Sequence, residues 1–132
     1  MKIKSSNPAF TLAKVREIAA FVKPSGVTNF SVWVKRSCRP CVAGTCYGHR
    51  NYIVARVGKL RFPYTSVDHG AYLGVKTYTM EEALVGLIAH ELRHLWQKKV
   101  KHGWRVWGAK GQYSERDADA YAIRKVREWR RR

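Results

Sequence analysis

The sequence predicts a small α+β domain with a short mixed or antiparallel sheet, and three observations support this fold class. The chain has 132 residues, which suits one ordinary domain. Hydrophobic residues make up 45% of it, enough for a modest core. These residues recur at helical spacing in three stretches and favour strands in three shorter ones. No internal repeat is present, so we expect residues 1–132 to form a single domain.

The first predicted helix covers Leu12–Val22, because Thr11 can cap it and Pro24 ends it. Strands are expected over residues 29–35 and 51–57, where β-branched and aromatic residues are concentrated. The segment between these strands, residues 36–50, is rich in Cys, Gly and Arg and is expected to be a loop. After an irregular stretch over 60–68, residues 71–79 form a third strand candidate.

The second and third helices are each expected to begin with a capping box. Thr79 and Glu82 mark the start of the second, which should run to about Lys99. Ser114 and Asp117 mark the start of the third, which should run nearly to the end of the chain. A connector rich in Gly and Trp joins the two helices. The order of elements is therefore helix, strands, helix and helix.

The charge balance is strongly basic, with 26 Lys and Arg against 9 Asp and Glu and a formal net charge of +17. A field of this sign attracts polyanions, so nucleic acid is a possible partner. Residues 124–132 form a basic tail in which Trp129 either stacks on a base or packs against the fold. No apolar run approaches the ~20 residues of a membrane span, and no signal peptide is seen. We expect a cytoplasmic monomer, microbial or viral, without membrane contact.

The segment His90-Glu91-Leu92-Arg93-His94 is the clearest sign of chemistry. His90 and His94 lie one turn apart on one face of the second helix, so both imidazoles can reach one zinc ion. Glu91 is rotated by about 100°, where it can reach a water molecule on the metal. A shuffled chain of this composition would contain about 0.008 such segments, so coincidence is a poor explanation.

A catalytic zinc ion usually has three protein ligands, and the best third candidate is Glu115 at the start of the last helix. Asp119 follows Glu115 by one turn and can hold the second ring nitrogen of a ligand histidine. A structural alternative is that Glu115 and Asp117 only stabilise the positive end of the helix.

This pattern, His90-Glu91-x-x-His94 with Glu115-x-x-x-Asp119, resembles the gluzincin metallopeptidases, and the short chain is similar to a minigluzincin. The resemblance covers about a third of the chain, from roughly Thr79 to Tyr121. It implies a zincin-like fold and a zinc-dependent peptidase with a protein or peptide substrate. It also implies that His90, His94 and Glu115 bind zinc, that Glu91 is the general base, and that Asp119 supports a histidine.

A second, weaker resemblance makes His102 the alternative third ligand. His102-Gly103 and the tryptophans that follow are similar to the segment that supplies the third histidine in SprT-like proteases, which act near DNA. The spacing of eight residues after His94 is short for that family. Two further functions remain open: a basic nucleic-acid-associated protein with a structural or vestigial zinc site, and a zinc amidase acting on cell-wall peptides.

Four more potential ligands lie within residues 38–49, namely Cys38, Cys41, Cys46 and His49. They offer a possible second, structural zinc site, although their spacing is tighter than usual. Free cysteines in a basic loop, or a redox pair of Cys38 and Cys41, are the alternatives.

For the peptidase, three residues are candidate donors to the oxyanion: Tyr113, Arg116 and His69. An extended peptide substrate can pair with an exposed strand edge, and the segments 51–57 and 71–79 are the two candidates for that edge.

Overall fold

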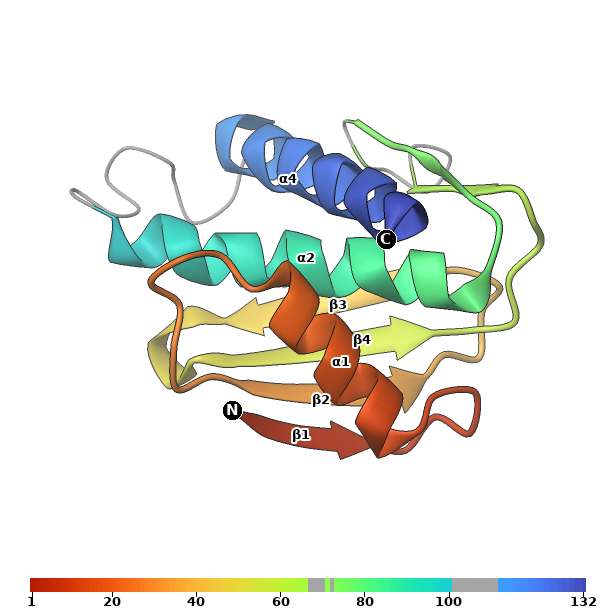
Figure 1. Cartoon of the computed structure of the whole chain (residues 1–132), viewed down its shortest axis with the longest axis horizontal. Helices are drawn as coiled ribbons and strands as arrows, with labels where there is room; N and C mark the ends of the chain where they lie inside the picture. Colours follow the sequence, from red (N-terminus) through yellow and green to blue (C-terminus); the bar gives the residue numbers. More distant parts are fainter. Residues whose placement is uncertain (67–70, 72, 101–111) are drawn as a thin grey trace.

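A four-stranded mixed sheet forms one layer of the protein, as the computed structural model shows for residues 1–66, 71, 73–100 and 112–132 (Figure 1). The order across the sheet is β1 (Lys2–Ser5), β2 (Ser31–Arg36), β4 (Tyr52–Val57) and β3 (Val42–Tyr47). The pairs β1–β2 and β2–β4 are parallel, and β3 is antiparallel to β4. The predicted α+β fold with a small mixed sheet is therefore confirmed.

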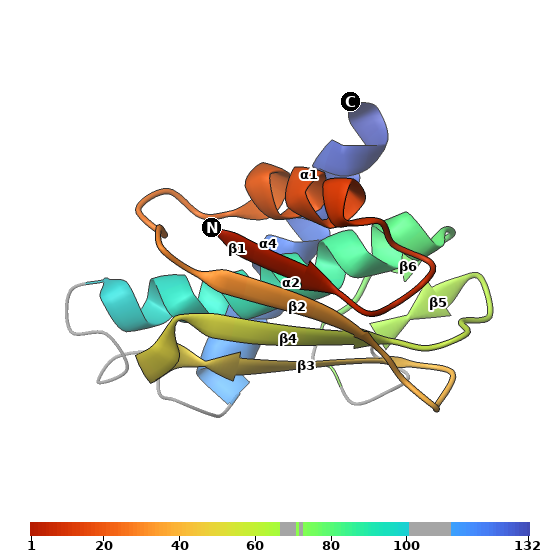
Figure 2. The same cartoon turned by 90° about the horizontal axis from the view of Figure 1, so that it is seen from below.

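Among the described residues, three α-helices form the second layer, on one side of this sheet (Figures 1 and 2). They are α1 (Leu12–Val22), α2 (Met80–Lys99) and α4 (Gln112–Arg131). The predicted bounds of α1 and α2 are confirmed, and the hydroxyls of Thr11 and Thr79 accept the capping hydrogen bonds. These caps are local interactions, which is why the sequence predicts the helix starts so closely.

The last helix differs from the prediction at its start. Ser114 lies within the first turn of α4 instead of ahead of it, so the predicted capping box there is wrong. Ser114 is fully buried, and its carbonyl accepts a hydrogen bond of 2.8 Å from Gln97 of α2. Packing against α2 therefore determines the position of this residue.

The segment predicted to be a loop, residues 36–50, instead contains β3 and the short 3-10 helix η1 (Gly48–Arg50). Its sequence lacks a clean apolar alternation, and none of the six residues of β3 is buried in the structure. β1 was also missed, since its partner β2 is far away in the sequence.

The candidate strand over 71–79 is wrong in length, because its described residues, 71 and 73–79, contain only β6 (Lys76–Thr77). β6 pairs with β5 (Tyr64–Thr65), which lies within the stretch expected to be irregular.

The core lies between the sheet and α2. Alternate residues of β2 and β4 are buried on the helix side, and they meet the buried face of α2, which includes Leu84, Ile88, Leu92 and Leu95. Burying such side chains contributes about 1.5–3 kcal/mol each, so α2 is firmly fixed on the sheet. None of the described helices combines the length and the hydropathy that a membrane span requires.

The basic tail belongs to the packed end of α4. Trp129 is only 6% exposed and meets Phe21 of α1 edge to face, with ring centroids 5.1 Å apart. The packing alternative for Trp129 is therefore confirmed, and this ring is not available to stack on a base.

Candidate metal centre

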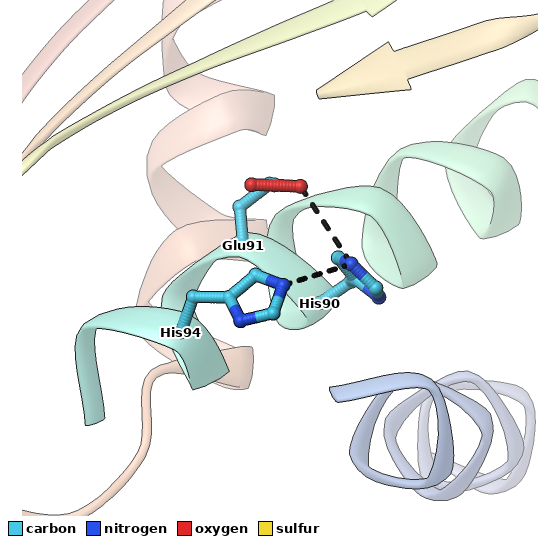
Figure 3. Close-up of side chains that lie close together, drawn as sticks. All are labelled: His90, Glu91 and His94. Carbon is cyan, nitrogen blue, oxygen red and sulfur yellow. Dashed lines mark hydrogen bonds and ion pairs between the residues drawn. The ribbon is translucent and has the colours of Figure 1, made fainter. Parts of the chain in front are cut away.

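Helix α2 brings the two histidines of the motif together. The Nε2 atoms of His90 and His94 lie 3.2 Å apart, and Figure 3 shows both rings on the same side of the helix. Opposite them, Leu84, Ile88 and Leu95 are fully buried and hold the helix in place. The spacing of four residues and the amphipathic pattern together determine this arrangement.

Helix α4 adds the carboxylate of Glu115 to this pair. One oxygen lies 3.0 Å from Nε2 of His90 and the other lies 3.2 Å from Nε2 of His94. Ligand atoms at ~2.0–2.1 Å from a tetrahedral zinc ion lie about 3.3–3.4 Å from one another. The three groups are therefore spaced nearly as zinc requires, and the donor set of two imidazoles and one carboxylate is one that zinc prefers.

The other ring nitrogen of each histidine has its own hydrogen-bond partner. Nδ1 of His90 lies 2.8 Å from Asp119, whose second oxygen accepts from the backbone N–H of Leu73 at 3.0 Å. Nδ1 of His94 lies 2.8 Å from the amide oxygen of Gln97. Both partners are acceptors, so Nδ1 of each ring carries a proton, and a ring that is neutral would have its Nε2 lone pair free to bind a metal ion.

Gln97 is a site residue that the sequence reasoning missed. It is fully buried, and besides accepting from His94 it donates to the carbonyl of Ser114 and to Asp117. Its position three residues after His94, on the same helix face, is the signal that could have found it.

Asp117 has a different role from the helix cap expected for it. Its two oxygens accept from Nε and Nη2 of Arg93 at 2.8 and 3.2 Å, in a bidentate pair between α4 and α2. Arg93 in turn lies over the ring of Trp96. These contacts fix the distance between the two helices that carry the ligands.

Glu91 lies beside the cluster, on the side facing β3 (Figure 3). Its nearest oxygen is 3.8 Å from Nε2 of His90, whereas the nearest oxygen of Glu115 is 3.0 Å from the same atom. A Cβ atom on Gly44 of β3 would lie 2.8 Å from both Cγ and Oε1 of Glu91. Only glycine at position 44 lets the carboxylate approach the strand this closely, and this requirement was also missed.

Burial and neighbouring charges shift the pKa values of the cluster. Burial raises the pKa of Glu91, and the nearby histidines only partly oppose this effect. Burial lowers the pKa of His90, but the Asp119 and Glu115 carboxylates outweigh it and raise this pKa to about 10. The hydrogen bonds from both histidines hold the pKa of Glu115 well below its usual range. The metal-free site thus stabilises positive charge between its carboxylates, where a divalent cation would bind.

The site opens into a cavity of about 350 Å³ between α2, α4 and β3. His90, Glu91, Glu115 and Asp119 contribute to its lining. The remainder is mostly apolar and includes Val42, Leu73, Val75, Leu87, Ile123 and Val126. Tyr113 and Arg116, two of the candidate oxyanion donors, are exposed on α4 and do not contribute to this lining. The third candidate, His69, and the alternative ligand His102 lie outside the described residues.

The four potential ligands of the cysteine segment are not gathered in the same way. Within the described part of the chain, Cys38, Cys41, Cys46 and His49 do not belong to a cluster of possible metal ligands, whereas His90, Glu91 and His94 do. Cys38, Cys41 and Cys46 are all free thiols. Strand β3 extends the chain by about 3.3 Å per residue, which separates Cys41 from Cys46.

Comparisons of this chain with protein-family models, with curated proteins and with solved structures found no match.

Proposed function

We propose that this protein is a zinc-dependent metallopeptidase, similar in its site to the gluzincins. One observation carries the proposal: the Nε2 atoms of His90 and His94 and the carboxylate of Glu115 converge to within 3.0–3.2 Å of one another. Three ligands leave one position open for water, which is the arrangement of catalytic zinc sites. A purely structural site would have four protein ligands.

The residues present fit zinc in both charge and protonation. Two neutral imidazoles and one carboxylate give a donor set with a net charge of −1, and Asp119 adds a second negative charge behind His90. Zinc bound there would polarise a substrate carbonyl and lower the pKa of an attacking water toward about 7.

Glu91 is the general base in this proposal. It is buried, its pKa is raised, and its nearest oxygen lies 3.8 Å from Nε2 of His90, farther away than the 3.0 Å of Glu115. A carboxylate with a raised pKa is better matched to take a proton from water and to return it to the leaving amine. Because Gly44 has no side chain, this carboxylate has room on the side of the cluster that faces β3.

Strand β3 is the proposed binding edge for the peptide substrate. In the sheet order β3 is outermost and has β4 on one side only, and Val42, Ala43 and Gly44 line the cavity. An extended peptide could therefore add to β3 by main-chain hydrogen bonds. Neither segment that the sequence suggested is this edge: residues 52–57 form the internal strand β4, and residues 76–77 pair with β5 outside the main sheet.

The apolar cavity beside the metal centre indicates the kind of side chain that the substrate presents. Val75, Leu87 and Val126 offer apolar surface within reach of the cluster. A large apolar side chain next to the cleaved bond would gain about 25 cal/mol for each Å² that it buries there.

The test is to replace Glu91 by Gln and to measure both bound zinc and cleavage of a peptide library. We expect zinc at one equivalent per chain and a loss of turnover of at least about 100-fold, because the base is removed while the ligands remain. Glu128→Gln, on the surface of α4, is the matched control and should keep both properties. A variant at Glu91 that still cleaves peptides at the normal rate would remove this residue from the mechanism.

A further inference from the structure

The face of the sheet that points away from the helices carries its own pattern of side chains. Along β2, Val32 and Val34 point to the core, whereas Trp33 and Lys35 point to the opposite side. In β4, Ile53, Ala55 and Val57 face the core, and Tyr52, Val54 and Arg56 face the opposite side, where Val54 is also buried. Figure 2 views this open face, and none of the three described helices covers it. The metal centre lies on the other side of the sheet, where Gly44 meets Glu91.

Strand register places aromatic and basic residues side by side on the open face. Trp33 lies next to Lys4 of β1, and Tyr52 of β4 lies next to Tyr47 of β3. Lys35 lies next to Arg56 of β4. Trp33, Lys35, Tyr47, Arg50, Tyr52 and Arg56 together line a shallow depression of about 280 Å³, with Val54 at its base. Three aromatic rings and several cations thus share one surface.

The charge of this face has one sign only. None of the nine carboxylates of the chain lies in the four strands, and no Asp or Glu occurs anywhere between Glu17 and Asp68. An open sheet face that served solubility alone would carry charges of both signs. The complete absence of acidic side chains from the strands instead indicates a partner with negative charge along its length.

The rings are held in positions that suit stacking. Trp33 donates its indole N–H to the Ser6 hydroxyl at 3.1 Å, while the Nζ atoms of Lys4 and Lys35 lie 4.2 and 3.9 Å from its ring centroid. Tyr47 and Tyr52 stack with centroids 5.7 Å apart and planes at 21°. An exposed cation–π contact contributes only about 0.5–1 kcal/mol, whereas a base stacked on an aromatic ring contributes about 1–3 kcal/mol. A base can therefore displace either lysine from Trp33, and the freed ammonium group can contact a phosphate.

We propose that the open face of the sheet, defined by Trp33, Lys35, Tyr47, Tyr52 and Arg56, binds single-stranded nucleic acid. Bases stack on the rings, and the cations follow the phosphates. A duplex keeps its base faces stacked inside and cannot offer them to these rings. The contacts involve base faces and phosphates, which DNA and RNA share. The surface therefore binds oligo-dT and oligo-U with affinities that agree within a few-fold.

This binding site is independent of the metal centre. The two lie on opposite faces of one sheet, and no residue of the open face is a proposed ligand or base. The Glu91→Gln variant therefore binds the nucleic acid as the unchanged protein does.

The test is fluorescence anisotropy with labelled oligo-dT and oligo-U of about 12 nucleotides at ~50 mM salt, in the full chain. We expect binding that weakens steeply with salt and a hairpin duplex that binds much more weakly. Trp33→Ala should weaken binding about 5- to 150-fold, which is the loss of one stacked base, and Trp33→Phe should restore most of it. Circular dichroism checks the fold of each variant, and the charge-matched double variants described next carry the test if Trp33→Ala does not fold.

A pair of charge-matched double variants distinguishes this face from general basicity. Lys35→Gln with Arg56→Gln removes two charges from the open face, and Arg124→Gln with Arg127→Gln removes two exposed charges from α4. The first pair should weaken binding at least about tenfold, and the second should weaken it less than about threefold. Equal losses in both pairs, an unaffected Trp33→Ala variant, or a duplex that binds as tightly as the single strand would each overturn the proposal.

Discussion

Asp119 reaches across from α4 to Nδ1 of His90 at 2.8 Å, while its other oxygen accepts from the backbone of Leu73 at 3.0 Å. The Asp119 carboxylate thus orients the ring of His90, a proposed ligand, and also holds the backbone at Leu73. Both of its oxygens face donors.

Asp119→Asn should therefore lower the affinity for zinc by about 10- to 100-fold, because an amide can accept from only one of the two donors. Competition with a chromophoric chelator measures the affinity, and Glu128→Gln on the same helix is the control. An unchanged affinity would show that Asp119 does not support His90.

Glu115→Ala should reduce bound zinc well below one equivalent per chain, because it removes one of three ligands. His102→Ala should leave the zinc content unchanged, and elemental analysis of both variants decides between the two candidate ligands. The opposite pattern would favour the SprT-like alternative.

Gly44→Ala should keep the zinc ion but lower turnover by about 100-fold, since the new methyl group displaces the carboxylate of Glu91. Thr45→Ser, one residue later in β3 and outside the cavity lining, is the control. Equal activity in the Gly44 variant would mean that Glu91 adapts without cost.

Cys46 should react slowly with iodoacetamide across neutral pH. Burial and the nearby Glu91 charge raise the pKa of its thiol to about 12, so only about 10⁻⁴ of it is thiolate at pH 8. The rate should rise about tenfold per pH unit up to pH 10, and Glu91→Gln should accelerate it because a negative charge is removed. Peptide mapping by mass spectrometry measures this, with the exposed Cys38 as the reference. A plateau below pH 10 would contradict the raised pKa.

Glu82→Gln should destabilise the fold by about 1 kcal/mol, the usual effect of losing a capping interaction. The Glu82 carboxylate accepts from the Tyr78 N–H and from Arg130 of α4, each at 2.9 Å. The pKa of Glu82 is lowered, chiefly by Arg130. This stabilisation is therefore present above the ordinary glutamate pKa and is lost as the pH falls through the lowered value.

Urea unfolding at pH 7 and pH 3 measures the effect of Glu82→Gln. The difference between the variant and the unchanged protein should shrink at the lower pH. Combining Glu82→Gln with Arg130→Gln in a double-mutant cycle isolates the ion pair. A difference that stays constant with pH would show that the charge of Glu82 contributes nothing.

The parts of the fold and site that could be predicted are those that depend on local sequence. Thr11 and Thr79 fix two helix starts through hydrogen bonds within a few residues. The spacing within α2 and within α4 was enough to propose His90, His94, Glu115 and Asp119.

The parts that were missed depend on contacts between distant segments. β3 was taken for a loop because none of its residues is buried and its sequence shows no apolar alternation, and the role of Gly44 follows only from its contact with Glu91. Gln97 and the pair of Arg93 with Asp117 likewise require two helices to be in place. Sequence spacing can suggest which residues act together, but it does not show which residues of other elements contact them.

The alternation of core-facing and outward-facing residues along β2 and β4 has a consequence for any complete mutational survey of this protein, with Val54, which faces outward but is buried, as an exception. Substitutions at Val32, Val34, Ile53 and Ala55 alter the layer that holds α2. Substitutions at Trp33, Lys35, Tyr52 and Arg56 leave that layer intact. Tolerance read along these strands by thermal stability should therefore oscillate with a period of two residues. Loss of nucleic-acid binding should follow the same period but peak at the alternate positions, because the two faces of the sheet contact different partners.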